Sequence, residues 1–91
     1  MGLKYTTQAL GYQQITSVSS AVGLTVPTGA TRALIVAEGA NVRWRDDGTN
    51  PTSSVGMLLL ASNLLSYDGD LNRIKFIEVT SSAKLNISYY N

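Results

Sequence analysis

Short runs of apolar residues alternate with turn-forming residues along the chain, and no helix-length stretch has the 3.6-residue period of an amphipathic helix. Clusters of Gly, Pro, Asn, Asp and Ser separate these runs at intervals of about 8–12 residues, a spacing typical of β-sandwiches and barrels. We therefore predict an all-β fold, a single small β-sandwich or jelly-roll-like domain of about seven or eight short antiparallel strands. This domain is expected to span residues 1–91.

The expected strands follow the apolar and alternating runs. They lie at residues 22–26, 32–37, 41–45, 57–60, 64–67, 73–80 and 84–90. Residues 1–20, where Gly11 interrupts a segment rich in Tyr, Thr and Gln, are expected to form an arm or edge strand. Because only three residues, Glu38 to Ala40, separate the strands at 32–37 and 41–45, we predict that these two form a hairpin.

Alternation within the expected strands predicts the core. The residues expected to be mostly buried are Leu34, Val36, Val42, Trp44, Leu58, Ile74, Phe76, Leu85 and Ile87. Trp44 is the only tryptophan, and it shares a strand face with Val42. We interpret it as a core anchor, with a sugar-stacking platform as the alternative.

The composition indicates a protein that associates with others. Charged residues make up 14% of the chain, against roughly 25% in most soluble domains. A surface so poor in charge is often covered by a partner, most simply a second copy. The net charge of +1 gives no electrostatic basis for nucleic-acid binding. The apolar run at residues 55–65 is too short to cross a membrane. We therefore expect neither nucleic acid nor membrane as a partner.

The residue types present disfavour catalysis. The chain has no Cys and no His, which removes thiolate chemistry, the commonest general base and the commonest metal ligands. Asp46 and Asp47 are adjacent, so on a strand they would face opposite ways and could not share a substrate. Followed by Gly48 and Pro51, they have the composition of a loop. We predict no enzymatic activity, no catalytic residue and no cofactor.

One segment has partial metal-ligand spacing. Asp68, Asp70 and Asn72 match the first three ligand positions of an EF-hand loop. Arg73 then replaces the required glycine, and Val79 replaces the final glutamate. We predict an ordinary turn and no metal site, and a looser calcium site is the alternative.

Five residues are candidates for an interface: Tyr5, Arg43, Arg45, Tyr89 and Tyr90. The segments at residues 5–14 and 87–90 read as edge strands, whose unpaired backbone groups invite a strand from a neighbouring copy. Arg43 and Arg45 share one strand face, where they could pair with carboxylates of a neighbouring strand or subunit. We therefore expect a homo-oligomer.

Residues 26–90 resemble small structural proteins encoded among the head and tail genes of tailed bacteriophages. The shared features are "VRWRDDGTNPT" at residues 42–52, Gly56 before an apolar strand, "IKFIEV" at 74–79 and "LNISYY" at 85–90. The resemblance implies a non-enzymatic component of the virion, either a capsid decoration or cement protein or a head–tail protein. It also implies binding to the major capsid protein or other virion proteins, and it favours a trimer. A carbohydrate-binding β-sandwich module of a phage tail or cell-surface protein, with Trp44 and the tyrosines as stacking platforms, is the alternative.

Overall fold

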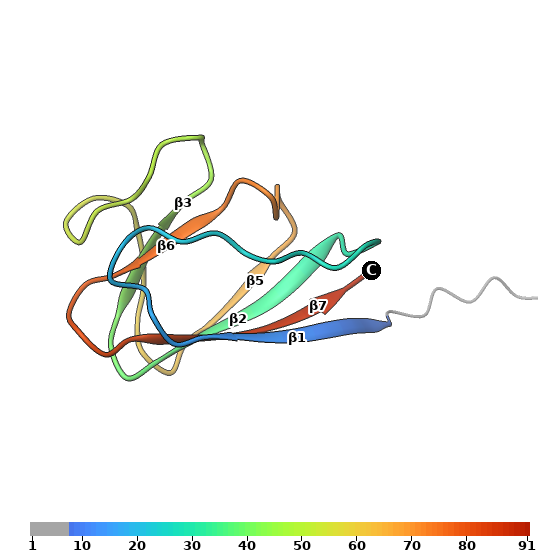
Figure 1. Cartoon of the computed structure of the whole chain (residues 1–91), viewed down its shortest axis with the longest axis horizontal. Helices are drawn as coiled ribbons and strands as arrows, with labels where there is room; N and C mark the ends of the chain where they lie inside the picture. The colour runs from blue at the N-terminus through green and yellow to red at the C-terminus, as the bar shows by residue number, and fades with distance from the viewer. Residues whose placement is uncertain (1–7) are drawn as a thin grey trace, which may run out of the picture.

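The chain forms an all-β domain of two sheets (Figure 1), in a computed structural model that describes residues 8–91. Within these residues seven strands are present, and no helix is long and apolar enough to cross a membrane. The strands are β1 (Ala9–Ile15), β2 (Arg32–Glu38), β3 (Val42–Arg45), β4 (Met57–Leu59), β5 (Leu64–Tyr67), β6 (Lys75–Glu78) and β7 (Lys84–Tyr90). The predicted fold class is confirmed. The strand expected at 22–26 is reduced to an isolated bridge between Val22 and Phe76.

The strands form a four-stranded sheet in the order β1-β7-β2-β5 and a three-stranded sheet in the order β4-β3-β6. All neighbouring strands are antiparallel. Buried side chains from both sheets form a single apolar cluster, so the sheets enclose one core between them. The molecule is therefore a small β-sandwich.

Alternation along the strands decides which side chains enter this core. In the four-stranded sheet, β2 buries Ala33, Ile35 and Ala37 opposite Tyr89, Ile87 and Leu85 of β7. The predicted burial of Val42, Ile74, Phe76, Leu85 and Ile87 is confirmed.

The core prediction for Leu58 is wrong, and those for Leu34, Val36 and Trp44 are met in part. Leu34 and Val36 are half-buried on the outer face of β2. Because β2 is apolar on both faces, its sequence pattern does not show which face lies against the core. Leu58 is 50% exposed, and Leu59 is buried. A run of three leucines does not show from the sequence which of them points into the core. Trp44 is half-buried and packs against the core cluster.

The hairpin predicted between residues 32–37 and 41–45 does not form. β2 and β3 belong to different sheets, so the short link between them crosses from one layer of the sandwich to the other. Gly39 makes this crossing with φ of +87°, and a Cβ at this position would lie 2.6 Å from the carbonyl oxygen of Ser82. The short, glycine-containing link is thus a corner between layers.

The connection at residues 16–31 closes one side of the sandwich. Val22 exchanges two backbone hydrogen bonds of 2.9 Å with Phe76, and Glu78 N–H donates to the carbonyl of Val18 at 2.9 Å. The same connection then runs back along the four-stranded sheet (Figure 1), where Thr25 N–H donates to the Gln13 side chain at 3.1 Å. The edge of β6 is therefore covered, and β1, β4 and β5 are the outer strands of the two sheets.

The position of β7 corrects one expectation about edges. Residues 87–90 were expected to offer an edge strand, but β7 lies between β1 and β2 and pairs with both. Long apolar runs with clean alternation fit central strands as well as edges, so the pattern alone did not separate the two. The N-terminal expectation holds for the described residues, since β1 is an outer strand.

Candidate interaction surface

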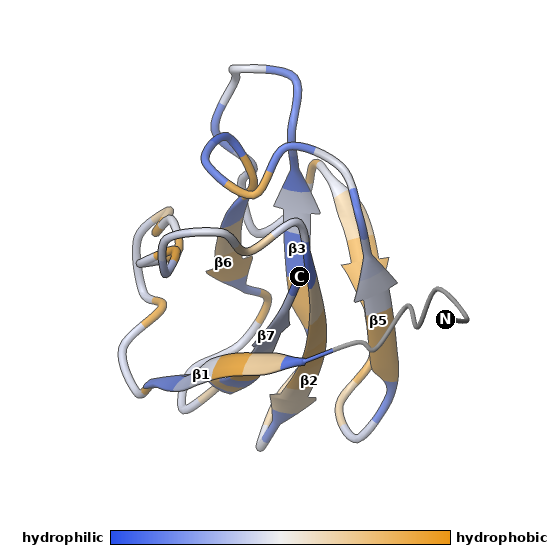
Figure 2. Ribbon diagram, turned by 90° about the vertical axis from the view of Figure 1, so that its right-hand side faces the viewer, coloured by the Kyte–Doolittle hydropathy of each residue, from blue (hydrophilic) through white to orange (hydrophobic). Residues whose placement is uncertain are grey.

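Exposed apolar side chains are concentrated on one side of the sandwich. Of the six large apolar side chains that are most exposed in the described residues, five lie within residues 55–64. We call these five the β4–β5 edge: Val55, Met57, Leu58, Leu60 and Leu64. They belong to β4, its flanking residues and the start of β5, and Figure 2 shows the apolar colour of β5 and of the turn that leads into it.

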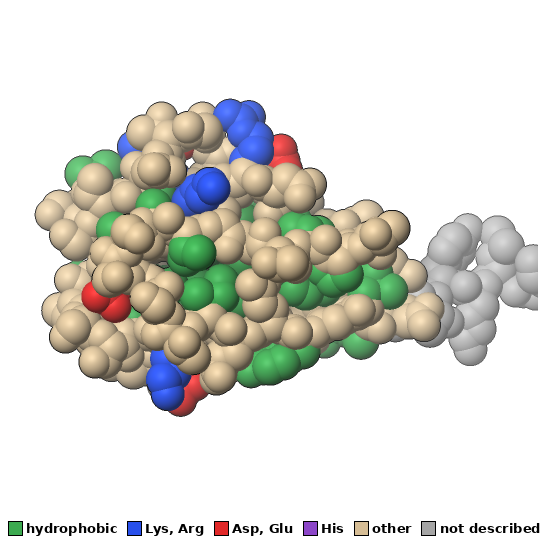
Figure 3. Space-filling view, in the orientation of Figure 1, with side chains coloured by type: hydrophobic (Ala, Val, Ile, Leu, Met, Phe, Trp, Pro, Cys, Tyr) green, Lys and Arg blue, Asp and Glu red, His purple; other side chains and the backbone are tan. Residues whose placement is uncertain are grey.

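This surface carries no formal charge. Residues 48–67 form a stretch of the sequence without a single Asp, Glu, Lys or Arg. Figure 3 shows another face of the molecule, on which several charged side chains are visible and some of opposite sign lie side by side. An apolar, uncharged surface at the open edge of a sheet is typical of a protein contact site.

A pocket of about 270 Å³ adjoins the β4–β5 edge, lined by Arg45, Asp46, Asp47, Val55, Gly56 and Met57. Gly56 has φ of +142°, and a Cβ there would lie 3.1 Å from both the Arg43 side chain and the Trp44 carbonyl. Only glycine therefore lets the chain return this closely to β3.

Arg43 fixes the loop between β3 and β4. Its Nε donates to the carbonyl of Ser53 at 3.2 Å and its Nη1 donates to the carbonyl of Gly56 at 2.9 Å. This side chain was expected to pair with carboxylates of a neighbouring strand or subunit. It instead binds main-chain carbonyls of its own loop, which sequence reasoning could not place beside β3.

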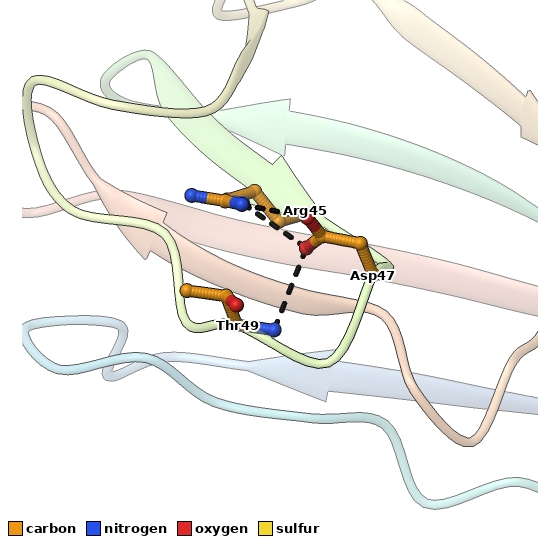
Figure 4. Close-up of polar contacts among 3 residues, drawn as sticks. All are labelled: Arg45, Asp47 and Thr49. Carbon is orange, nitrogen blue, oxygen red and sulfur yellow. Dashed lines mark hydrogen bonds and ion pairs between the residues drawn. The ribbon is translucent and has the colours of Figure 1, made fainter.

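Arg45 pairs with a carboxylate of the same loop. Its Nε and Nη2 donate to the two carboxylate oxygens of Asp47 at 3.1 and 2.6 Å, and Thr49 N–H donates to Asp47 at 3.4 Å (Figure 4). The hydrogen bond from Arg45 is the main reason that the pKa of Asp47 falls to about 2. Two of the three charged residues that line the pocket, Arg45 and Asp47, are thus paired with each other, and Asp46 is the third.

Trp44 of β3 and Tyr67 of β5 pack against each other. Their ring centroids lie 5.8 Å apart at an interplanar angle of 69°, an edge-to-face contact between β3 and β5. The Tyr67 hydroxyl donates to Asp46 Oδ2 at 2.6 Å. Trp44 therefore occupies the position of a packing residue that joins the two sheets, whereas a sugar-stacking platform needs an exposed ring face.

The remaining interface candidates lie elsewhere. Tyr89 is 1% exposed, because alternation along β7 points it into the core, where its hydroxyl donates to Gln13 Oε1 at 2.6 Å. It is not available for an interface in this fold. Tyr90 lies on the opposite face of β7, with the Arg32 guanidinium 5.7 Å from its ring centroid. Tyr5 lies outside the described residues.

The four candidates within residues 8–91 are therefore not gathered at one site, and sequence reasoning missed the β4–β5 edge. A signal for it was present in the uncharged stretch at 48–67. Residues 57–60 and 64–67 were expected to form strands with Leu58 buried, because burial and exposure at a sheet edge look alike in sequence.

The segment at 68–72 forms a turn with its own hydrogen bonds. Asp70 Oδ1 accepts from Asn72 N–H at 3.0 Å, and the Asp70 carbonyl accepts from Arg73 N–H at 3.0 Å. Across residues 8–91 there is no group of three or more Asp, Glu, His or Cys side chains placed to hold a metal ion. The side chain of Asp70 thus takes part in turn formation.

Comparisons of the chain with protein-family models, curated proteins and solved structures found no match. The fold and the surface together define a class, a small two-sheet β-sandwich with an uncharged apolar edge. The resemblance to phage structural proteins stays a prediction.

Two tyrosines are expected to ionise late in an alkaline titration followed by ultraviolet absorbance. Burial raises the pKa of both Tyr67 and Tyr89 to about 12, and the hydrogen bond to Asp46 adds to the effect at Tyr67. Their contribution to stability is therefore complete below the ordinary tyrosine pKa of about 10 and is lost as the pH rises through about 12.

The variants Tyr67→Phe and Tyr89→Phe identify these groups, since each should remove one late-ionising tyrosine from the titration. If either variant removes a group that titrates near the ordinary value instead, the assignment for that residue is wrong.

Proposed function

We propose that this chain is a non-enzymatic structural protein of a tailed-phage virion, a capsid decoration or cement protein or a head–tail component. In this role it associates with itself and binds shell proteins. The observation that carries the proposal is the β4–β5 edge, where five large apolar side chains stand exposed within ten residues. Exposing such a surface to water is unfavourable. The surface therefore supports a protein that functions as part of a complex.

The surroundings of this surface support the same role. The loop above the pocket is held by Arg43 and by the Arg45–Asp47 pair, so the surface is ordered before any partner arrives. Preorganisation lowers the entropy cost of binding. A contact made of uncharged apolar groups also depends little on ionic strength, which suits a particle that must stay intact outside the cell.

The carbohydrate-binding alternative receives less support from the surface. Trp44, the ring best suited to stacking on a sugar, is half-buried and has its neighbour Tyr67 in edge contact. Stacking a sugar on this ring would require the buried part of the side chain to become exposed.

Particles of a phage whose genome encodes this chain provide the direct test. After density-gradient purification and a high-salt wash, mass spectrometry should detect the chain in stoichiometric amount relative to the major capsid protein. A non-structural protein of the same phage serves as the control for carry-over. Absence of the chain from washed particles, or a level equal to that control, would overturn the virion role.

A further inference from the structure

We propose that the β4–β5 edge binds a second copy of this chain about a two-fold axis. In this arrangement β4 pairs antiparallel with β4 of the other copy, and the two three-stranded sheets become one sheet of six strands. The inference rests on the proposed assembly function, and it makes a second copy of the chain the partner of this surface.

β4 has an unused backbone edge. It is the outer strand of its sheet and pairs only with β3, and among the described residues Met57–Leu59 make no backbone hydrogen bond beyond that pairing. The opposite edge of the same sheet, at β6, is covered by Val18 and Val22. An unpaired edge strand is a template for another strand, so β4 is where this sheet can grow.

Charge favours a copy of the chain as the occupant. Residues 48–67 carry no charge, and of the three charged residues that line the adjoining pocket, Arg45 and Asp47 form an ion pair while Asp46 accepts a hydrogen bond from the Tyr67 hydroxyl. The apolar residues of two such surfaces can therefore meet without like charges between them. A different partner selected by electrostatic complementarity would require charges on this surface, whereas interfaces between identical subunits are the more apolar class.

The register of a two-fold pairing matches the shape of the surface. Leu58 is the middle residue of β4, so an axis at this position sets Leu58 opposite its own counterpart and Gly56 opposite Leu60 of the second copy. The pocket of about 270 Å³ lies at Gly56. Leu60, which is 45% exposed, would enter that pocket, and the symmetry would fill both pockets in the same way.

The outer strand β1 fits this role less well. β1 contains a register shift between Ala9 and Gly11, and such bulges blunt an edge against pairing. A three-fold ring, which the resemblance favours, needs two different surfaces of the chain to meet. A strand that pairs with itself needs only one, so the geometry of β4 points to a dimer.

Multi-angle light scattering of the purified chain at micromolar concentrations tests the proposal. The unaltered chain should show the mass of two chains, and Leu58→Lys should show the mass of one, because the variant places two like charges at the axis. Tyr12→Lys is the matched control, since it adds the same charge at a side chain 66% exposed on β1 and should leave the dimer intact. Circular dichroism confirms that each variant is folded.

Two further variants report on the axis itself. An equimolar mixture of Leu58→Lys and Leu58→Glu should recover the two-chain mass, because only a two-fold axis near Leu58 brings these side chains together. The chain contains no cysteine, so Leu58→Cys can form a disulfide only with another copy. Oxidation should link it far faster than Tyr12→Cys, since a disulfide requires Cα atoms about 4.4–6.8 Å apart.

The outcomes separate this inference from the virion role. A one-chain or three-chain mass for the unaltered protein, or equal crosslinking of the two cysteine variants, overturns the two-fold dimer. If the protein is a monomer and Leu58→Lys prevents its incorporation into particles, the surface belongs to a shell protein, and the dimer is likewise overturned. Absence from particles together with an intact dimer overturns the virion role alone.

Discussion

Phe76→Ala is expected to lower the free energy of unfolding by about 3–5 kcal/mol, as large-to-small changes at buried aromatic sites do. Phe76 is fully buried in β6, opposite Trp44 of β3 and bridged to Val22 on its other side. Removing the ring leaves a cavity between three segments that cannot all collapse onto it. Small domains have a total stability near the low end of about 5–15 kcal/mol, so a large unfolded fraction should appear without denaturant.

Urea unfolding at fixed protein concentration measures this effect, because association alters apparent stability. The matched control is Tyr12→Ala, which removes an aromatic ring at a side chain that is 66% exposed. It should change the free energy of unfolding by less than about 1 kcal/mol. Equal losses in the two variants would show that Phe76 does not occupy the core.

Gly39→Ala is expected to lower the free energy of unfolding by about 2–5 kcal/mol, because two effects act together. The backbone at Gly39 has φ of +87°, a conformation that strains any residue with a Cβ. The added methyl group would also stand 2.6 Å from the Ser82 carbonyl oxygen, a backbone atom that cannot rotate away. The corner between β2 and β3 would therefore have to shift.

Gly29→Ala separates the two effects. Gly29 has the same φ of +87°, but the nearest atom to an added Cβ is Leu10 Cδ1 at 3.8 Å, an ordinary contact. This variant should lose only the conformational part, about 1–2 kcal/mol. Urea unfolding of the pair tests the close approach of Ser82, and equal losses would count against it.

Features that depend on neighbouring residues were predictable from sequence. β propensity and turn residues located β2, β3, β5 and β7 to within a residue or so, and alternation identified Val42 and Leu85 as core residues. Features that depend on distant pairing were not. The sequence around Gly39 fits a hairpin as well as a corner between layers, and only the pairing of β3 with β4 and β6 decides between them.

The candidate surface shows the same division. Hydrophobicity marks residues 57–60 as a strand, but three consecutive leucines do not show which face of that strand lies against the core. Likewise, Arg43 has the features of a solvent-facing or interface residue until the loop returns its Ser53 and Gly56 carbonyls to the guanidinium. Tertiary contacts between segments decided these points.

The central place of β7 has a consequence for how the domain is made. β7 is the last of the seven described strands to leave the ribosome, yet within residues 8–91 it is the only strand that β1 pairs with, and Tyr12 donates to Asn86 across 74 residues of chain. Before β7 emerges, β1 lacks this partner and the four-stranded sheet lacks one of its two inner strands. Such long-range closure makes folding slow, on a scale of milliseconds to seconds. The pairing of β1 with β7 can therefore form only after β7 has been synthesised.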